Sequence, residues 1–363
     1  MKLNILVLGA SYGSLFATKV LMAGHRVSMV CTRPTADLIG REGTRVRFPI
    51  RGREALLEVS SADLPGVLSA NTPDEVDEED YDLVVLGMQE TQYGGQGVRE
   101  LMQRIARARK PCLAITNMPP LPYLRRIPGL STGPLEACYA DPGVWETFEP
   151  GLMTLASPDP QAFRPAGEPK NVLQVGLPTN FKAARFDAPQ PTALLRQLET
   201  DIEQARVPDG GAGIEVPVKL KVHESMFVPL AKWPMLIAGN YRCVRPQDMI
   251  AIKDAVHGNL DESREIYNWV AQLCTRLGAE SEDLVPFEKY AKAAESLGKP
   301  SSAARALASG AEHIERIDSL VRRIARQRGL QSERLHQIVT LVDERLATNR
   351  AQQSALRTAV VLS

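Results

Sequence analysis

The first thirty residues alternate between short apolar runs and a segment with helical periodicity. Residues 4–10 form a β-branched apolar run that closes on a glycine, as is typical of a strand buried on both faces. Residues 14–25 carry apolar side chains three and four positions apart, and Gly24 is a helix stop signal. Residues 26–33 have the pattern of a second strand. This order predicts a β-α-β unit, the context in which a glycine loop after the first strand has meaning.

The alternation continues through the first half of the chain. Residues 82–88 and 111–120 are expected to be buried strands, with a helix over 94–110 between them. Alternating strands and helices favour a parallel, doubly wound sheet whose ligand crevice lies outside the carboxyl ends of the strands.

Between about residues 128 and 190 proline and glycine become frequent. Short strands are expected at 151–157, 171–177 and 182–188. We interpret this stretch as an extension of the same sheet with long loops, followed by a helix over 191–206.

A glycine- and proline-rich break at 207–217 marks the expected domain boundary. Beyond it nearly every segment has helical periodicity, in the ranges 221–241, 260–278, 302–329 and 332–360. Pro229 and Pro234 are expected to kink or divide the first of these helices. The sequence therefore predicts an α/β chain with a Rossmann-type dinucleotide-binding domain over 1–207 and an all-α domain over 208–363.

Composition narrows the function classes. The 363 residues are 44% apolar and 24% charged, with 43 basic and 43 acidic side chains and a formal net charge of zero. No overall field therefore draws the chain to nucleic acid or to an anionic membrane, and no apolar run reaches the roughly 18 residues of a membrane span. The five cysteines are odd in number and widely spaced, which indicates reduced thiols in the cytoplasm.

The loop after the first strand has two of the three glycines of a dinucleotide loop. Gly9 suits the tight turn and Gly13 the close packing of helix on strand, but they are four residues apart instead of five. Ser11 and Ser14 could donate hydroxyl hydrogens to a phosphate at the helix start. The alternative is that this unit has lost its cofactor and kept its fold.

The residues after the predicted strands indicate which cofactor would bind. The crevice is expected near Gly9, Gln89 and Asn117. The second strand ends without an acidic residue, and Thr32 and Arg33 suit the 2′-phosphate of NADP better than the free ribose hydroxyl of NAD. Taken alone, Arg33 could equally be an ordinary exposed arginine.

Four stretches resemble the ketopantoate reductase family in order and spacing: 13–47, 82–102, 113–120 and 298–330. The resemblance extends over most of the chain. The resemblance implies a Rossmann domain followed by a helical domain of the 6-phosphogluconate dehydrogenase C-terminal type, which together reduce a 2-oxo acid with NADPH. It places Asn117 beside nicotinamide and substrate, and Ser301 and Ser302 at the start of a substrate-binding helix. Gln89 stands where the family usually has a lysine.

The family's catalytic stretch fits in two registers. One puts Ser225, Pro229 and Trp233 where lysine, asparagine and asparagine are expected. The other puts Lys232 at the lysine and Asn240 at the second asparagine. The family's substrate-binding glutamate likewise falls on His313 without a gap, or on Glu315 with a small insertion.

Reduction of a carbonyl needs a group that protonates or stabilises the developing oxyanion. Lys232, in an apolar stretch, is one candidate, although it could be a surface lysine. His223, next to Glu224, is another, although a lone histidine is more often structural. The histidines are scattered and no metal-binding motif is present, so no metal is expected.

Two functions remain open. The first is an NADP-dependent oxidoreductase, with NAD less suitable, that acts on a small-molecule 2-oxo acid or derived imine other than ketopantoate. The second is a binding protein on the same fold that senses nucleotide or metabolite without turnover. A homodimer through the helical domain is expected because its aromatic residues exceed what one helical layer needs.

Overall fold

The computed structural model describes residues 2–208, 211 and 213–361, the last four of these without their side chains. The chain separates into two compact units, which are described one at a time. The first unit comprises Met1–Arg126 and Gly143–Pro229, and the second comprises Ile127–Pro142 and Leu230–Ser363.

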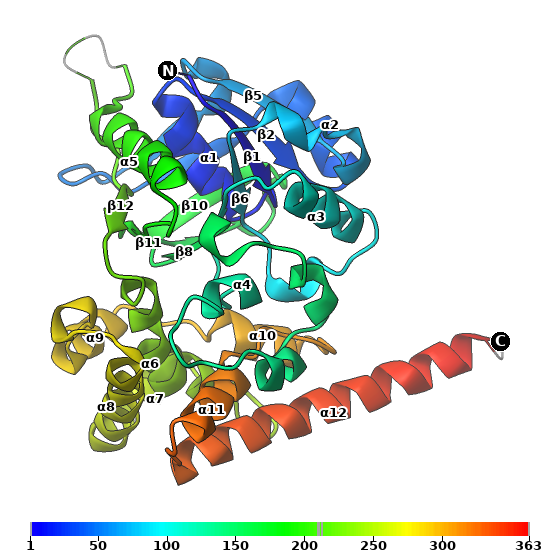
Figure 1. The fold of residues 1–363 in the computed structure, drawn as a ribbon, viewed down its shortest axis with the longest axis vertical. Coiled ribbons are helices and arrows are strands. Elements are labelled where there is room, and N and C mark those ends of the chain that lie inside the picture. Colours follow the sequence, from blue (N-terminus) through cyan, green and yellow to red (C-terminus); the bar gives the residue numbers. More distant parts are fainter. Residues whose placement is uncertain (1, 209–210, 212, 362–363) are drawn as a thin grey trace. The chain divides into compact units, whose positions relative to one another are not determined.

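A large, mainly parallel sheet forms the centre of the first unit (Figure 1). Within the described residues it has eight strands, in the order β12-β11-β8-β7-β6-β1-β2-β5. Their bounds are β1 (Asn4–Leu8), β2 (Arg26–Val30), β5 (Val67–Asn71), β6 (Leu83–Leu86), β7 (Cys112–Ala114), β8 (Met153–Ser157), β11 (Phe181–Ala184) and β12 (Leu220–His223). Neighbouring strands are parallel except β8 and β11. The predicted Rossmann-type sheet is confirmed.

The parallel strands end in one row. Leu8 pairs with Val30 and with Leu86, Leu86 pairs with Ala114, and Val30 pairs with Asn71. The chain runs from β1 to β2 and β5 on one side and from β6 to β7 and β8 on the other, so its direction reverses between β1 and β6. In open α/β sheets this reversal is where ligands bind.

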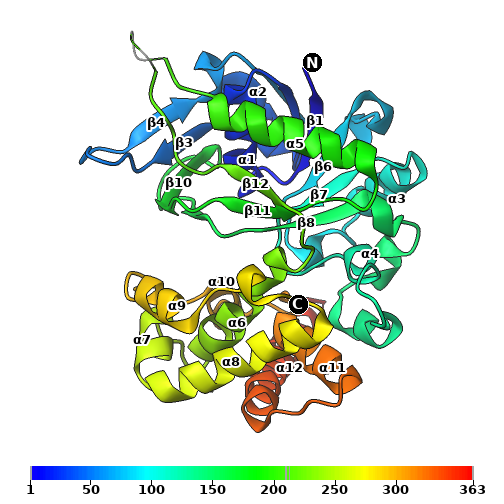
Figure 2. The same ribbon diagram turned by 60° about the vertical axis from the view of Figure 1, so that its left-hand side comes forward.

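A smaller sheet belongs to the same unit (Figure 2). In the described part of the chain its strands lie in the order β4 (Leu57–Ser60), β3 (Arg45–Phe48), β10 (Val172–Leu177) and β9 (Gln161–Phe163). The strand expected at 171–177 therefore exists, but it pairs with β3 and β9 and does not extend the large sheet.

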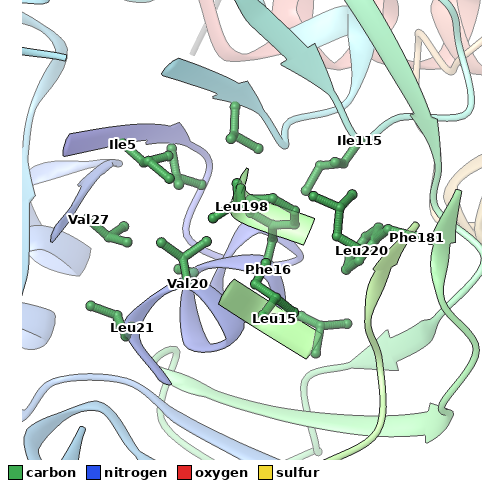
Figure 3. Packing of buried hydrophobic residues seen from close by; sticks show 14 of the residues in the cluster. Ile5, Leu15, Phe16, Val20, Leu21, Val27, Ile115, Phe181, Leu198 and Leu220 are labelled. Atoms are coloured by element: carbon green, nitrogen blue, oxygen red, sulfur yellow. The ribbon is translucent and has the colours of Figure 1, made fainter. Parts of the chain in front are cut away.

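Helix α1 (Gly13–Met22) is buried on all sides. Phe16 and Val20 pack with Ile5 of β1 and with Phe181 and Leu198, from β11 and helix α5, in one apolar cluster (Figure 3). Residues of the smaller sheet join this cluster, so both faces of the helix are covered. Each such side chain contributes about 1.5–3 kcal/mol on burial, which fixes the helix start that follows the glycine loop.

The other helices of the first unit are α2 (Arg33–Glu42), α3 (Val98–Arg107), α4 (Leu121–Leu124) and α5 (Pro189–Gln204). Those of the second unit are α6 (Trp233–Met235), α7 (Ile252–His257), α8 (Leu260–Leu277), α9 (Phe287–Ala294), α10 (Ser302–Ala308), α11 (Ile317–Gln327) and α12 (Glu333–Val361). The helical C-terminal part is confirmed.

Two helices expected from periodicity are interrupted. The range 221–241 begins as strand β12, because residues 220–223 pair with β11, and then forms short helical turns around Pro229 and Pro234. One of these is a π-helix, Leu236–Asn240. The range 302–329 contains α10 and α11, which are separated after Gly310, a residue with φ of 83°.

The boundaries between the two units lie after Arg126, Pro142 and Pro229, and the boundary expected from the sequence lies between residues 207 and 208. Residues up to Pro229 stay with the first unit because β12 completes the large sheet. Residues 127–142 join the second unit, where a turn at Gly133–Cys138 packs against α11. The predicted break at 207–217 falls partly on residues 209, 210 and 212, which lie outside the described residues.

Arg126 fastens the loop that precedes α5. Its guanidinium donates to the carbonyl oxygens of Met153 and Arg185, at 2.9 and 3.0 Å, and to the Asp187 carboxylate at 2.7 Å, with a side chain only 2% exposed. We expect Arg126→Met to lower the free energy of unfolding by about 2 kcal/mol, because it removes this donor from two partly buried carbonyl oxygens and breaks the pair with Asp187. Urea denaturation measures this, and Arg109→Met, at an exposed pair with Glu149, should change it by about 0.5 kcal/mol or less.

Candidate site at the strand ends

The glycine loop holds β1 close to β6. Gly9 has φ of 105°, which L side chains rarely adopt, and its N–H donates to the carbonyl of Val30 at 2.9 Å. A Cβ built on Gly9 would lie 2.7 Å from Met88 Cγ and 3.0 Å from the carbonyl oxygen of Gly87. The first loop glycine therefore makes both the turn and a close approach of backbone to backbone.

Gly13 and Ser14 open α1. A Cβ on Gly13 would lie 2.8 Å from Val7 Cγ1, so Gly13 lets the helix pack on its strand as the third glycine of such a loop does. Ser14 is buried, and its hydroxyl donates to the Ser11 carbonyl at 2.7 Å. That hydroxyl is used to shape the loop. Ser11 is exposed, beside the first N–H groups of the helix, which have no acceptor four residues back.

Tyr12 ties this loop to the segment before β9. Its hydroxyl donates to the carbonyl of Pro160 at 2.6 Å, and its ring packs edge-on to Phe181 at 5.9 Å between ring centroids. Burial raises the pKa of Tyr12 well above its usual value of 10.0. Tyr12 therefore stays protonated and fixes the position of the loop.

Gln89 follows β6, which pairs with β1, and Asn117 follows β7, the next strand beyond β6. Gln89 is exposed, and its backbone N–H donates to Gln92 Oε1 at 3.1 Å. Asn117, three residues beyond β7, is half-buried, and its Oδ1 is buried without a hydrogen-bond partner within the described residues. A buried amide oxygen without a partner carries a free-energy cost, so it marks a place where a ligand donor would be stabilised.

Thr32 and Arg33 begin α2 at the end of β2. Both are exposed, and Thr32 Oγ1 donates to Thr35 Oγ1 at 3.1 Å. The residues that follow β5 hold the Arg33 side chain. Its Nη2 lies 2.6 Å from Glu75 Oε1 and donates to Thr72 Oγ1 at 3.1 Å. Its guanidinium is thus paired with a carboxylate.

Arg164 is a second arginine near the end of β2, and the sequence pattern does not indicate it. Arg164, just after β9, is exposed and makes no ion pair within the described residues, yet it lies close enough to Cys31 to oppose the burial that raises the pKa of that thiol to about 11. The sequence carries no signal for this proximity, because β9 belongs to the smaller sheet.

His223 ends β12 and is half-buried. Strands β8 and β11 separate β12 from β7, and three strand spacings of about 4.8 Å are too many for His223 to contact Asn117. The two residues share a sheet edge without forming one cluster.

In the second unit, Lys232 and Asn240 flank an irregular helical stretch. Lys232 is half-buried and ends a turn over Val228–Lys232, while Asn240 ends the π-helix. Tyr290 supports this stretch by donating its hydroxyl to the carbonyl of Met235 at 3.1 Å. Single-turn π-helices occur frequently at functional sites.

The serine pair at α10 lies against the π-helix. Ser301 is buried, its hydroxyl donates to the Asn240 carbonyl at 2.7 Å, and it accepts from the Ala304 N–H at 3.2 Å. Ser302 is exposed at the first position of α10. The structure thus brings Ser301 and Asn240 together, with the Ser301 hydroxyl committed to the fold.

His313 and Glu315 lie between α10 and α11. His313 is exposed, and Glu315 is half-buried with its carbonyl accepting from the Tyr241 hydroxyl. The neighbouring Arg316 pairs with Asp318 at 3.0 Å and with Asp343 at 2.7 Å, which fixes the chain that follows these two residues.

The following statements on metal sites and membrane-spanning helices hold for residues 2–208, 211 and 213–361. No group of three or more histidine, cysteine, aspartate or glutamate side chains there could hold a metal ion. None of the helices there has the length and apolar character needed to cross a membrane. A cavity of about 560 Å3 lies in the second unit among Trp269, Arg322, His336 and the start of α12, and it includes none of the residues predicted above.

No protein-family model and no curated protein matches this sequence significantly. Solved structures do match. A protein from Ralstonia solanacearum described as a putative ketopantoate reductase superposes with a TM-score of 0.66 at 14% identity, covering 96% of this chain and 99% of that one. The fold is that of the ketopantoate reductases.

Two other structures extend the comparison. A D-mandelate dehydrogenase solved with NADH and anilino(oxo)acetate has a TM-score of 0.62 at 14% identity, with coverage of 96% and 99%. A dimeric ketopantoate reductase from Staphylococcus aureus has a TM-score of 0.57 at 9% identity, with coverage of 96% and 100%. At these identities the similarity establishes the fold, and function has to be argued from the site.

Proposed function

We propose that this protein is an NADPH-dependent oxidoreductase of the ketopantoate reductase type that reduces a 2-oxo acid, or an imine formed from one. The observation that carries the proposal is the Asn117 amide oxygen, buried and without a partner in the described chain, which follows β7 at the same sheet edge as the glycine loop. Strand β6 lies between β7 and β1, and the strand order reverses between β6 and β1, which is where such folds bind dinucleotides.

The chain's residues would have separate roles. The N–H groups at the start of α1 would bind the pyrophosphate, and the Asn117 side chain would orient nicotinamide and substrate. When bound, the nicotinamide supplies a hydride to the carbonyl or imine carbon, and the oxygen or nitrogen takes a proton. Lys232 is our candidate for the proton donor, with His223 second, and Asn240, Ser302, His313 and Glu315 are candidates for substrate contacts.

The substrate would differ from ketopantoate because several polar residues of the family pattern are replaced or committed to the fold. Gln89 removes a cation, and the hydroxyl of Ser301 bonds to the main chain. The D-mandelate dehydrogenase that shares this fold was solved with an oxo-acid amide derivative, which favours a 2-oxo acid class for this chain as well.

The proposal is tested by titrating the purified protein with NADPH and with NADH, followed by cofactor oxidation against a panel of 2-oxo acids with and without amines. We expect micromolar NADPH binding and oxidation with at least one acid. Absence of binding of either cofactor would refute the proposal.

The second candidate is a binding protein that senses nucleotide or metabolite without turnover. It is favoured by Arg33, which is paired with Glu75, and by the serine hydroxyls used within the fold. Tight cofactor binding with no oxidation across the panel would support it.

We also keep three finer expectations as parts of this proposal. The protein would be a homodimer, as the Staphylococcus aureus reductase of this fold is described to be, and sedimentation would test this. It would act in the cytoplasm, and its five cysteines, all free, would be reduced there. NADPH would be preferred over NADH through the cations at the end of β2.

A further inference from the structure

Strand β2 is not followed directly by an acidic residue. Glu75, which follows the adjacent strand β5, lies beside the end of β2 instead. Val30 of β2 pairs with Asn71 of β5, so the residues that follow the two strands are neighbours. After β5 the chain turns at Pro73–Glu75, and this turn places Glu75 Oε1 2.6 Å from Arg33 Nη2. A dinucleotide fold uses an acid at this position to bind the free ribose hydroxyl.

Glu75 is fixed in its place. Its Oε2 accepts from the Thr72 N–H at 2.9 Å, and the Thr72 hydroxyl lies 2.9 Å from the same oxygen. The hydrogen bond from Arg33 lowers the pKa of Glu75 to about 2, so the carboxylate is ionised at every pH at which the protein would work. Arg33 is therefore permanently matched by a negative charge.

The surrounding charge disfavours a second anion. The Asp37 and Asp74 carboxylates also interact electrostatically with the Arg33 guanidinium, which Glu75 already pairs. Arg164, which interacts with Cys31, makes no ion pair among the described residues. A 2′-phosphate carries a charge of about −1.5 to −2 and would have to displace Glu75 to reach Arg33. The neutral 2′-hydroxyl of NADH has no such conflict and could donate to Glu75.

We propose that Glu75 is a specificity-determining residue that competes with the 2′-phosphate of NADPH for Arg33 and so narrows the preference of this chain for NADPH over NADH. The inference rests on the proposed function, since it assumes that the glycine loop binds a nicotinamide dinucleotide. It assigns Glu75 no role in the chemical step.

The test uses Glu75→Gln in the full chain. Glutamine keeps an oxygen to accept from the Thr72 N–H but lacks the charge that holds Arg33. We expect NADPH to bind about tenfold more tightly, the effect of removing one like charge from a partly exposed site, with NADH unchanged or weakened by about threefold. Fluorescence titration gives both dissociation constants.

A matched control is available. Glu58 is as exposed as Glu75, at 39%, and lies 2.7 Å from Arg47 in the smaller sheet. Glu58→Gln should leave both cofactor affinities unchanged. In Arg33→Gln the preference for NADPH should fall, and adding Glu75→Gln to it should tighten NADPH less than Glu75→Gln does in the parent, because the competition requires Arg33.

The outcomes separate the two claims. If the parent binds cofactor but Glu75→Gln leaves the ratio of NADPH to NADH affinity unchanged, or lowers it, the competition is refuted while the proposed function stands. If neither the parent nor any variant binds either cofactor, the proposed function fails and the inference fails with it.

Discussion

Ser11→Asp is expected to weaken NADPH and NADH binding by about a hundredfold, because it places a negative charge where the pyrophosphate would meet the first N–H groups of α1. Ser11 is exposed, and the aspartate can project into water when no cofactor is present. The loop backbone should therefore keep its conformation. Titration with both cofactors, together with a thermal denaturation curve, measures affinity and folding separately.

The control for this prediction is Ser11→Asn, which has nearly the same size and no charge. It should bind cofactor within about threefold of the parent, since only steric changes remain. Equal affinity of the parent and Ser11→Asp for NADPH would mean that the pyrophosphate does not lie at this loop. Loss in both variants would show that side-chain volume, and not charge, matters at position 11.

Position 13 is less suitable for such a test, although the glycine pattern draws attention to it. Gly13 is buried, and a Cβ there would lie 2.8 Å from Val7 Cγ1. A charged residue would have to leave the core or break the contact of α1 with β1, at a cost in stability. Loss of binding in a Gly13 variant would therefore not separate a damaged fold from a blocked cofactor.

Much of the first unit could be predicted because its pattern is local. The runs ending at Leu8, Leu86 and Ala114 are apolar and bounded by turns, and parallel strands must bring their carboxyl ends to one edge. The pattern therefore predicts that Gly9, Gln89 and Asn117 lie at this edge, and in the structure they follow β1, β6 and β7, while their binding roles stay predictions. The pairing of Arg33 with Glu75 could not be predicted, since it depends on β5 lying beside β2, and the short β5 was not identified.

The chain after residue 207 is harder to predict, because long-range contacts override the helical periodicity there. Residues 220–223 form β12 because they pair with the edge of β11, although the residues that follow them have apolar side chains at helical spacing. Likewise the chain leaves α10 after Gly310, so His313 and Glu315 are not on one helix face. At residues 220–223 the pairing with β11 therefore overrides the helical pattern. After α10 the turn at Gly310 interrupts it.

The environment of Lys19 also depends on contacts with residues that are distant in the sequence. Lys19 lies on α1, 1% exposed, under the smaller sheet, and donates from Nζ to the carbonyls of Val216 and Pro217 at 2.8 and 3.2 Å. These carbonyls precede Val218, whose φ of 71° is unusual for a β-branched residue. Burial, with a smaller contribution from Lys219, lowers the pKa of Lys19 to about 7 from 10.5.

This pKa makes stability depend on pH in a defined direction. Below pH 7 Lys19 is protonated in the folded and the unfolded chain, and the folded state bears the cost of a buried ammonium. Above pH 7 the folded chain releases the proton while the unfolded chain keeps it up to about pH 10.5. The unfolded state then binds more protons, so stability rises with pH, by about 1.4 kcal/mol per unit.

Lys19→Met should remove this dependence. Between pH 7 and pH 9 the free energy of unfolding of the parent should rise by about 2 kcal/mol relative to the variant, and well below pH 7 their difference should be constant. The two lost hydrogen bonds only offset the variant's curve by a fixed amount. Urea denaturation at pH 6, 7, 8 and 9 measures both curves, and ionisation of the unfolded chain's cysteines at about pH 8.5 cancels because both proteins contain the same cysteines.

Lys221→Met is the matched control, since Lys221 lies on β12, 40% exposed, and pairs with Glu203 at 2.6 Å. Its curve should run parallel to that of the parent, because water already solvates the ammonium. Parallel curves for Lys19→Met and the parent would instead mean that water reaches Lys19. The smaller sheet would then not seal α1, and the start of that helix, where the cofactor is proposed to bind, would be less firmly held than the packing around Phe16 implies.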